Sequence, residues 1–213
     1  MTTAKICGVS TPEAVAAALD GGAAFLGFNV FPASPRYVEP EAAARLAELV
    51  RARGVKVCAV TVDPDDGLVD RLMATLNPDL IQLHGRETPA RAAAVAARSG
   101  AEVIKALPVS EASDLDAARA YEGVVAHLMF DAKPPKDAAR PGGHGIAFDW
   151  SMLQGRSFAR PWFLAGGLDP WNVADAVRLS GAPMVDVSSG VERGPGLKDP
   201  ALISAFLEAV RRA

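Results

Sequence analysis

Polar side chains of the kinds that exchange protons with a substrate recur toward the ends of several short apolar segments. Alternate side chains of a strand point to the same side, and in five segments the polar residues share one parity while aliphatic residues occupy the other. These polar residues are Lys5 and Cys7, Gln82 and His84, Lys105, His127 and Asp131, and Asp186 and Ser188. If these segments are the strands of a parallel barrel, the polar residues face its interior. A barrel without a functional site would have mostly Val, Ile and Leu at those interior positions. The pattern therefore indicates an enzyme, although it does not identify the reaction.

Two glycine-containing segments predict a site for a phosphate group. Gly166 and Gly167 lie in LAGGLDPWNV, and Ser188, Ser189 and Gly190 lie in VDVSSGVE. Glycines let backbone N–H groups approach a ligand closely, and serines add hydroxyl groups beside them. In barrel enzymes the loops after strands seven and eight, with the N-terminus of a short helix, commonly bind phosphate. We therefore expect a phosphorylated substrate.

The elements that must position these residues alternate between short β-rich segments and Ala-rich helical segments. The predicted strands are Ala4–Val9, Phe25–Phe31, Val55–Val62, Leu80–His84, Val103–Leu107, Ala126–Asp131, Trp162–Ala165 and Met184–Ser188. The predicted helices are Pro12–Leu19, Pro40–Arg53, Gly67–Thr75, Pro89–Arg98, Glu111–Tyr121, Trp171–Leu179 and Pro200–Arg211. This alternation is typical of parallel strands joined by crossover helices.

Helix start and stop signals support this division. A capping side chain precedes a proline at three of the predicted helix starts, and a glycine follows four of the helices, where a left-handed terminator is expected. The caps are Thr11, Asp169 and Asp199, and the glycines are Gly21, Gly54, Gly100 and Gly181.

Eight such units in 213 residues predict an α/β fold, a (β/α)₈ TIM barrel with parallel strands that spans residues 1–213 as a single domain. The alternative is an open doubly wound sheet, but no G-x-G-x-x-G follows any strand, so a dinucleotide-binding fold lacks its motif. The polar stretch Lys133–Gly145 is rich in Pro and Gly and predicts a long mobile loop after strand six. Barrel enzymes often keep a lid in that place.

Charge and hydropathy exclude several classes of partner. The chain has 22 Lys and Arg against 25 Asp and Glu, and its longest basic cluster is the dipeptide Arg211-Arg212, which argues against nucleic acid. No apolar run reaches the roughly 18 residues of a membrane span, and the N-terminus lacks the pattern of a signal peptide. Two cysteines fit a reducing compartment. We therefore expect a cytoplasmic protein without a membrane partner.

The remaining reactive side chains have ordinary structural interpretations. Cys58 shares the parity of Val60 and Val62, and we expect it to face the helices as a core residue. The three histidines have no metal-ligand spacing, so no metal site is predicted: His84 is expected to line the pocket, His127 to be structural, and His144 to lie in the long loop. The acidic run Asp63–Asp66 is expected to form a helix cap and a solvated turn.

Seven segments, in order over nearly the whole chain, together resemble the phosphoribosylanthranilate isomerases, a barrel family of tryptophan biosynthesis. The segments are KICG (Lys5–Gly8), GFNVFPASPRYV (Gly27–Val38), IQLHG (Ile81–Gly85), FDA (Phe130–Ala132), GGHGIAFDW (Gly142–Trp150), LAGGLDPWNV (Leu164–Val173) and VDVSSGVERGPGLKD (Val185–Asp199). Any one of them would be a weak signal, whereas the ordered set is highly specific.

The resemblance implies an Amadori rearrangement of N-(5′-phosphoribosyl)anthranilate to the corresponding 1-deoxyribulose 5-phosphate, without metal or redox cofactor. By resemblance, Asp131 is the general acid that protonates the ring oxygen, and Cys7 is the general base that removes the C2′ proton. A free thiol with a pKa of about 8.5 needs nearby positive charge to ionise at neutral pH, and Lys5 is a candidate source. Asp131 needs partial desolvation to remain protonated.

The same resemblance suggests partners for the rest of the substrate. Arg36 is expected to bind the anthranilate carboxylate in two bonds, with a surface ion pair to Glu39 or Glu41 as the alternative. Asp186 is expected to hold the anthranilate nitrogen or a ribose hydroxyl, with a buried ion pair to Lys5 or Lys105 as the alternative. The expected partner is thus a small phosphosugar, bound by a monomer or a homodimer.

Two departures from the family pattern bear on fine substrate positioning only. Asn29 stands in the second strand where an aliphatic residue is expected, and the third strand ends in VTVDPD (Val60–Asp65) where Asn is more usual. The rival functions are a histidine-pathway or bifunctional sugar isomerase, a phosphosugar epimerase, and a silent phosphosugar-binding barrel. The first would carry Asp in place of Cys7 and two similar halves, the second a metal-binding set, and the third would need neither Cys7 nor Asp131.

Overall fold

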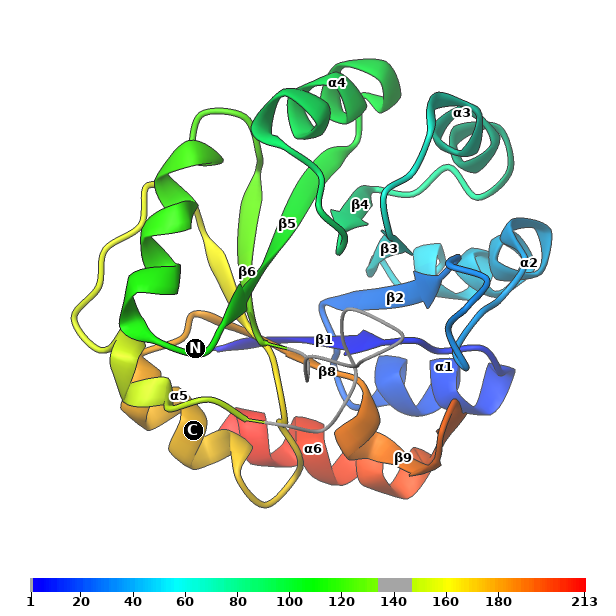
Figure 1. Ribbon diagram of the computed structural model, residues 1–213. Helices are drawn as coiled ribbons and strands as arrows, with labels where there is room; N and C mark the ends of the chain where they lie inside the picture. Colours follow the sequence, from blue (N-terminus) through cyan, green and yellow to red (C-terminus); the bar gives the residue numbers. More distant parts are fainter. Residues whose placement is uncertain (1, 134–146) are drawn as a thin grey trace.

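Eight parallel strands close into a barrel in which each strand pairs with the next along the chain and the last pairs with the first (Figure 1). This computed structural model describes residues 2–133 and 147–213. The strands are β1 (Thr3–Cys7), β2 (Phe25–Asn29), β3 (Lys56–Thr61), β4 (Leu80–Leu83), β5 (Glu102–Val109), β6 (His127–Ala132), β7 (Trp162–Leu164) and β8 (Met184–Val187). The predicted barrel is confirmed, and no strand end differs from its predicted position by more than two residues.

The interior of the barrel is a separate apolar cluster, distinct from the larger core between strands and helices. It holds Cys7, Phe25, Cys58, Val60, Leu80, Ile104, Ala106, Met129, Phe163, Ala165 and Met184. The prediction that Cys58 faces the helices is therefore wrong. Gly27 pairs with both Cys7 and Cys58, so the register places all three at one level of the barrel. Because β3 carries one polar residue on each face, Lys56 and Thr61, its polarity pattern does not show which face is inner.

Lys105 points outward, toward the helices, whereas its predicted parity placed it on the inner face of the strand. Its register partners, Leu83 and Leu128, belong to the outer core, whereas its neighbours Ile104 and Ala106 fill the barrel interior. The Lys105 ammonium is nevertheless buried, because it pairs with a carboxylate outside the barrel wall.

Helices cover the outside of the barrel. The α-helices are α1 (Pro12–Asp20), α2 (Pro40–Arg51), α3 (Asp66–Thr75), α4 (Pro89–Ser99), α5 (Val173–Ser180) and α6 (Pro200–Arg212). The shorter-pitch 3₁₀ helices are η1 (Ala112–Ala120), η2 (Trp150–Leu153) and η3 (Ser189–Val191). All but one of the seven predicted helices form as α-helices; the segment between β5 and β6 is the 3₁₀ helix η1.

Most of the expected caps are present. The side chains of Thr11 and Asp199 accept hydrogen bonds from the first turns of α1 and α6, and Gly100 and Gly181 end α4 and α5 with positive φ. Asp65 caps α3, as expected for the acidic run.

Three of the residues predicted to begin or end a helix act differently in the structure. Gly21 ends α1 with a right-handed φ of −75°, so the left-handed turn falls on the next residue, Gly22. Gly54 has positive φ, but α2 already ends at Arg51. Asp169 accepts N–H bonds from Trp171 and Asn172, in a turn that precedes α5.

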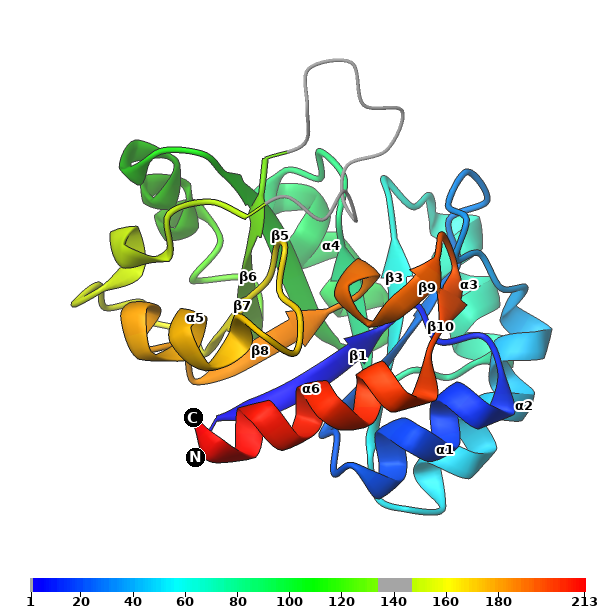
Figure 2. The same ribbon diagram turned by 90° about the horizontal axis from the view of Figure 1, so that it is seen from below.

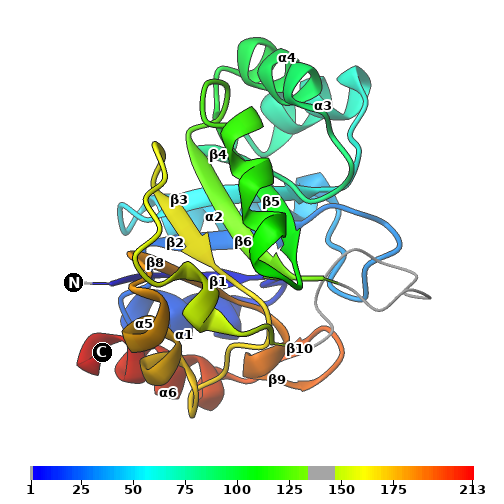
Figure 3. The same cartoon turned by 60° about the vertical axis from the view of Figure 1, so that its left-hand side comes forward.

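The start of β1 and the end of α6 lie at the same end of the barrel (Figures 2 and 3), and α6 packs beside α1. At the opposite end, a small hairpin of β9 (Glu192–Gly194) and β10 (Leu197–Lys198) follows β8 and lies beside the end of β1 (Figure 2). Among the described residues, no helix is long and apolar enough to cross a membrane. The predicted loop Lys133–Gly145 lies, apart from its first residue, outside the described residues, and so does His144.

Candidate active site

The two residues predicted to transfer protons lie at the C-terminal ends of their strands and face the barrel interior. Cys7 ends β1, and its side chain belongs to the interior cluster. Asp131 shares the inward parity of Met129 in β6, whose side chain fills the same cluster. Barrel enzymes place their catalytic groups at this end because the βα loops converge there. The structure thus puts a thiol and a carboxyl at one mouth.

A buried ion pair lies one layer below the thiol. Lys5 is fully buried, and its Nζ donates to Asp186 Oδ1 at 2.8 Å, across the paired strands β1 and β8. Gly27 leaves room for both groups, because a Cβ there would lie 3.1 Å from Lys5 Nζ and 3.3 Å from Cys7 Sγ. Asp186 therefore has the partner that its structural interpretation predicted.

Burial raises the pKa of the Cys7 thiol above its usual value, and the Lys5 ammonium offsets only part of that effect. Asp186 adds to the rise, whereas Lys198 opposes it. Burial alone would lower the pKa of Lys5, but the negative charge of Asp186 outweighs it and the pKa is raised, so Lys5 stays an ammonium. Lys5 thus supplies the expected positive charge, but burial outweighs it and the thiol pKa is raised overall.

A chain of hydrogen bonds leads from the barrel interior to Asp131. Gln82 Nε2 lies 2.8 Å from His84 Nδ1, and His84 Nε2 lies 3.1 Å from Asp131 Oδ2. In this arrangement the Gln82 amide donates to Nδ1, so the imidazole directs its Nε2 proton toward Asp131. The other carboxyl oxygen, Oδ1, accepts the Ala132 N–H at 2.9 Å. His84 lies at the site as predicted, and its contact there is to Asp131.

Arg36 is buried and faces a carboxylate, but not the one named in the alternative prediction. Its Nε and Nη2 donate to Glu192 at 2.7 and 2.9 Å, whereas Glu39 and Glu41 pair with Arg71. Gly8 allows this position, because a Cβ there would lie 2.7 Å from Arg36 Cδ.

Glu192 also accepts from Lys198 Nζ at 2.7 Å, and the same ammonium donates to the Ser188 carbonyl at 2.8 Å. Burial raises the pKa of Glu192, but Arg36 and Lys198 outweigh it and lower the pKa overall. Sequence reasoning missed both Glu192 and Lys198. The sequence contains one indication of this pair: Glu192 and Lys198 carry opposite charges and lie six residues apart, on either side of a Gly-rich turn.

The predicted phosphate residues form two loops in direct contact. Gly166 and Gly167 have φ values of +87° and +65°, a conformation that favours glycine. Gly190 allows the loops to meet, since a Cβ there would lie 1.9 Å from the Leu168 carbonyl oxygen. The N–H groups of Gly166 and Gly167 donate to no atom of the described residues. Ser188 and Ser189 follow β8 directly, and the Ser188 hydroxyl donates to the Cys7 carbonyl at 3.2 Å.

The first of these loops also lies against Asp131. A Cβ on Gly166 would lie 3.1 Å from Asp131 Oδ1, so the first loop packs on the carboxyl. Among the described residues, no group of three or more His, Cys, Asp and Glu side chains is arranged to hold a metal ion.

The chain is similar to proteins of one family over its whole length. The family model for N-(5′-phosphoribosyl)anthranilate isomerase matches residues 4–209. The N-(5′-phosphoribosyl)anthranilate isomerase of Caulobacter vibrioides is 67% identical over 210 residues, which cover 99% of this chain and 96% of that protein.

Solved structures agree with the sequence comparison. The crystal structure of phosphoribosyl anthranilate isomerase from Thermotoga maritima matches with a TM-score of 0.88 and 34% identity, covering all of both chains. A crystal structure of phosphoribosyl anthranilate isomerase in complex with reduced 1-(o-carboxyphenylamino)-1-deoxyribulose 5-phosphate matches with a TM-score of 0.85 and 31% identity, again over both whole chains.

Proposed function

The chain belongs to the N-(5′-phosphoribosyl)anthranilate isomerase family, and from this premise we propose which of its residues carry the reaction. It is an isomerase of tryptophan biosynthesis, which converts N-(5′-phosphoribosyl)anthranilate to 1-(2-carboxyphenylamino)-1-deoxyribulose 5-phosphate. The observation that carries the assignment is the position of Cys7 and Asp131, inward on β1 and β6 at the mouth bordered by the two glycine loops.

The reaction needs a proton donor at the ring oxygen and a proton acceptor at C2′. Asp131 donates its proton to the furanose oxygen, so the C1′–O bond breaks and the ring opens to a Schiff base. Cys7, as thiolate, then takes the C2′ proton, and the C–H electron pair forms the enolamine. In the tautomerisation to the ketone, Cys7 gives its proton to C1′ and the C2′ hydroxyl proton returns to Asp131, so both side chains regain their initial protonation states. No atom is lost from the substrate.

Neighbouring groups act on the thiol and hold the carboxyl in place. Lys5 favours the thiolate through its positive charge, although burial opposes ionisation. His84 orients the Asp131 carboxyl through Oδ2, and the Ala132 N–H fixes the other oxygen. A general acid or base held in place in this way typically contributes about 10²- to 10⁴-fold to the rate.

The substrate's two anionic ends have separate partners. Gly166, Gly167, Ser188, Ser189 and Gly190 bind the phosphate through backbone N–H groups and hydroxyls, in the two loops after β7 and β8. Arg36 binds the anthranilate carboxylate with the guanidinium N–H groups that Glu192 leaves available. Asp186, anchored by Lys5, contacts the anthranilate nitrogen or a ribose hydroxyl. The enzyme is predicted to work as a monomer or a homodimer.

An anthranilate-fluorescence assay tests the assignment. Freshly generated N-(5′-phosphoribosyl)anthranilate is mixed with enzyme in the presence of a chelator, and the loss of fluorescence is followed. Cys7→Ala and Asp131→Asn should each lower kcat by about 10²- to 10⁴-fold, with circular dichroism and melting curves like those of the wild type. A folded variant of either residue with wild-type kcat would overturn its role.

A further inference from the structure

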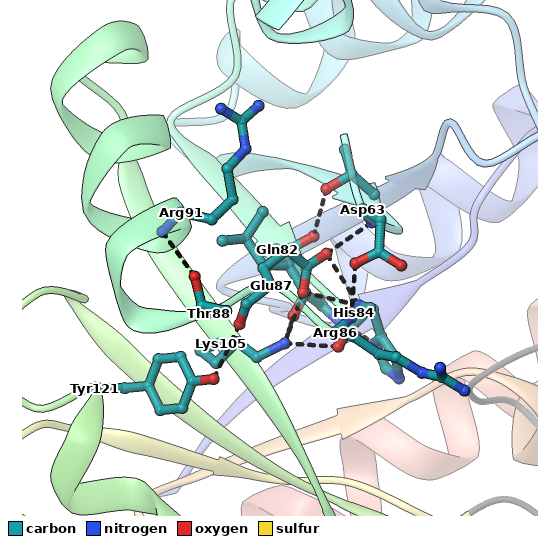
Figure 4. Close-up of polar contacts among 12 residues, drawn as sticks. Asp63, Gln82, His84, Arg86, Glu87, Thr88, Arg91, Lys105 and Tyr121 are labelled. Carbon is teal, nitrogen blue, oxygen red and sulfur yellow. Dashed lines mark hydrogen bonds and ion pairs between the residues drawn. The ribbon is translucent and has the colours of Figure 1, made fainter. Parts of the chain in front are cut away.

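A further buried ion pair, between Lys105 and Glu87, lies outside the barrel wall, next to the site but not in it (Figure 4). Lys105 Nζ lies 2.6 Å from Glu87 Oε2, and the two side chains are only 3% and 1% exposed. The Tyr121 hydroxyl donates to the Glu87 carbonyl at 2.9 Å, and its ring lies 5.9 Å from Lys105 Nζ. Neither charge faces the substrate, because Lys105 points away from the barrel interior.

This pair holds both backbone polar groups of Gly85, the residue that follows His84. The Gly85 N–H donates to the Glu87 carboxylate at 3.0 Å, and the Gly85 carbonyl accepts from Lys105 Nζ at 2.8 Å. On the other side, the His84 N–H donates to the Thr61 carbonyl at 2.9 Å. The backbone around His84 is therefore held on both sides: by the Thr61 carbonyl on one, and by the charged side chains of Glu87 and Lys105 on the other.

The loop after β3 is tied to the same carboxylate. The Asp63 N–H donates to Glu87 Oε1 at 2.8 Å, and Asp63 Oδ1 accepts from the Arg86 N–H at 2.7 Å. Asp63 holds a positive φ of 46°, which is uncommon for a residue with a side chain and persists only where its surroundings impose it. A Cβ on Gly85 would lie 2.5 Å from Asp63 Oδ1, so the two loops are in contact.

We propose that Glu87 and Lys105 are positioning residues for the isomerase reaction: they hold Gly85 so that His84 keeps its hydrogen bond to Asp131. The imidazole is the only contact by which this network reaches the acid among the described residues. A buried ion pair is a poor device for stability alone, since well-packed apolar residues often serve as well. Its charges do, however, bind the N–H and the carbonyl of one residue at the same time, which apolar side chains do not.

The proposal rests on the proposed function, because it matters only if Asp131 is the acid. The two are tested separately. Asp131→Asn reports on the proposed function, whereas the coupling between Glu87 and His84 is measured without changing Asp131.

The test is a double-mutant cycle on kcat with Glu87→Gln, His84→Ala and the double variant. A displaced catalytic group costs about tenfold or more in rate, so Glu87→Gln should lower kcat by about tenfold and leave KM within about twofold. In the His84→Ala background, Glu87→Gln should lower kcat no further. The pH profile of kcat/KM should shift in the same direction in both single variants.

Two further variants guard against misfolding of Glu87→Gln. Lys105→Met combined with Glu87→Gln removes both buried charges together, and Tyr121→Phe removes only the hydroxyl bond to the Glu87 carbonyl. Both should lower kcat in the wild-type background and not in the His84→Ala background. Lys56→Met serves as the matched control, because the Lys56–Glu102 pair bridges strand starts at the opposite end of the barrel, and it should leave kcat and the pH profile unchanged.

Three results would overturn the proposal. One is equal losses of kcat from the Glu87 change with and without His84. A second is a lower melting temperature with unchanged kcat, and the third is wild-type activity of His84→Ala. The first two would leave the ion pair a purely structural feature.

Discussion

At the scale of single residues, the site is defined by charges that are buried in opposed pairs. Two buried lysines, Lys5 and Lys198, lower the pKa of Cys7, and each pairs with a carboxylate, Asp186 and Glu192 respectively. Carboxylates therefore accompany both positive charges near the thiol. Burial raises the thiol pKa, and the two ammonium groups lower it. The sequence suggested Lys5 but not Lys198, because the second cation reaches the thiol only through the fold of the β9–β10 hairpin.

Two substitutions should move the thiol pKa in opposite directions. Asp186→Asn removes a negative charge that disfavours the thiolate, so the pKa of Cys7 should fall and more thiolate should form at a given pH. Lys198→Met removes a positive charge, so the pKa should rise. Thiolate absorbance at 240 nm measures both, with Cys7→Ser as the blank. Shifts of the same sign in the two variants would contradict this account of the thiol.

Substrate affinity should depend on the shape of the Arg36 guanidinium as well as on its charge. Arg36→Lys keeps the charge but loses the planar fork that binds a carboxylate in two bonds. Losing a charged hydrogen bond costs about 2 kcal/mol, so KM should rise by roughly 30-fold with a smaller change in kcat. Steady-state kinetics measure this, and a KM within twofold of wild type would remove Arg36 from the carboxylate site.

At the scale of elements, the site depends on loops that approach one another more closely than a side chain would allow. Gly8 admits Arg36, Gly166 lies against Asp131, and Gly190 lies against the β7 loop. All three glycines were visible in the sequence, and Gly166 and Gly190, which follow predicted strands, predicted a phosphate site. Which segments they touch was not visible, because each contact joins residues far apart along the chain.

Gly190→Ala should weaken phosphate binding. The new Cβ would lie 1.9 Å from the Leu168 carbonyl oxygen, so the two loops must separate. We expect KM to rise by about tenfold or more, and inorganic phosphate to inhibit less well as a competitor. Gly123→Ala is the matched control, because a Cβ there meets nothing within 4 Å. Equal kinetics in the two variants would argue that the β7 and β8 loops do not bind the phosphate.

At the scale of the whole molecule, closure of the barrel decides which face of each strand is inner. The eight strands and most helices could be predicted, because their signals are local: apolar runs, capping residues and glycines. The inward position of Cys58 and the outward position of Lys105 could not, since β3 has one polar residue on each face and Lys105 stands between apolar neighbours in β5. The resemblance predicted that Cys7 and Asp131 form the catalytic pair, and this stays a prediction. The ion pairs Arg36–Glu192 and Lys105–Glu87 became visible only in the structure.

The buried Glu192 links stability of the whole fold to pH. Its pKa is lowered in the folded protein, despite burial, by Arg36 and Lys198, so folding favours the carboxylate. That contribution is present above its ordinary pKa of 4.5 and is lost as the pH falls through the lower folded value. Glu192→Gln should therefore have a lower free energy of unfolding than wild type at pH 7. The difference between the two proteins should become smaller in acid. Urea unfolding at several pH values tests this, and a gap that widens in acid would contradict it.

Removal of the C2′ proton by Cys7 is tested by a single-turnover rate with substrate that carries deuterium at C2′. Cys7→Ala should slow this step by about 10²- to 10⁴-fold and show the full primary isotope effect, while substrate still binds. A Cys7→Ala enzyme that breaks the C2′–D bond at the wild-type rate would show that another group is the base.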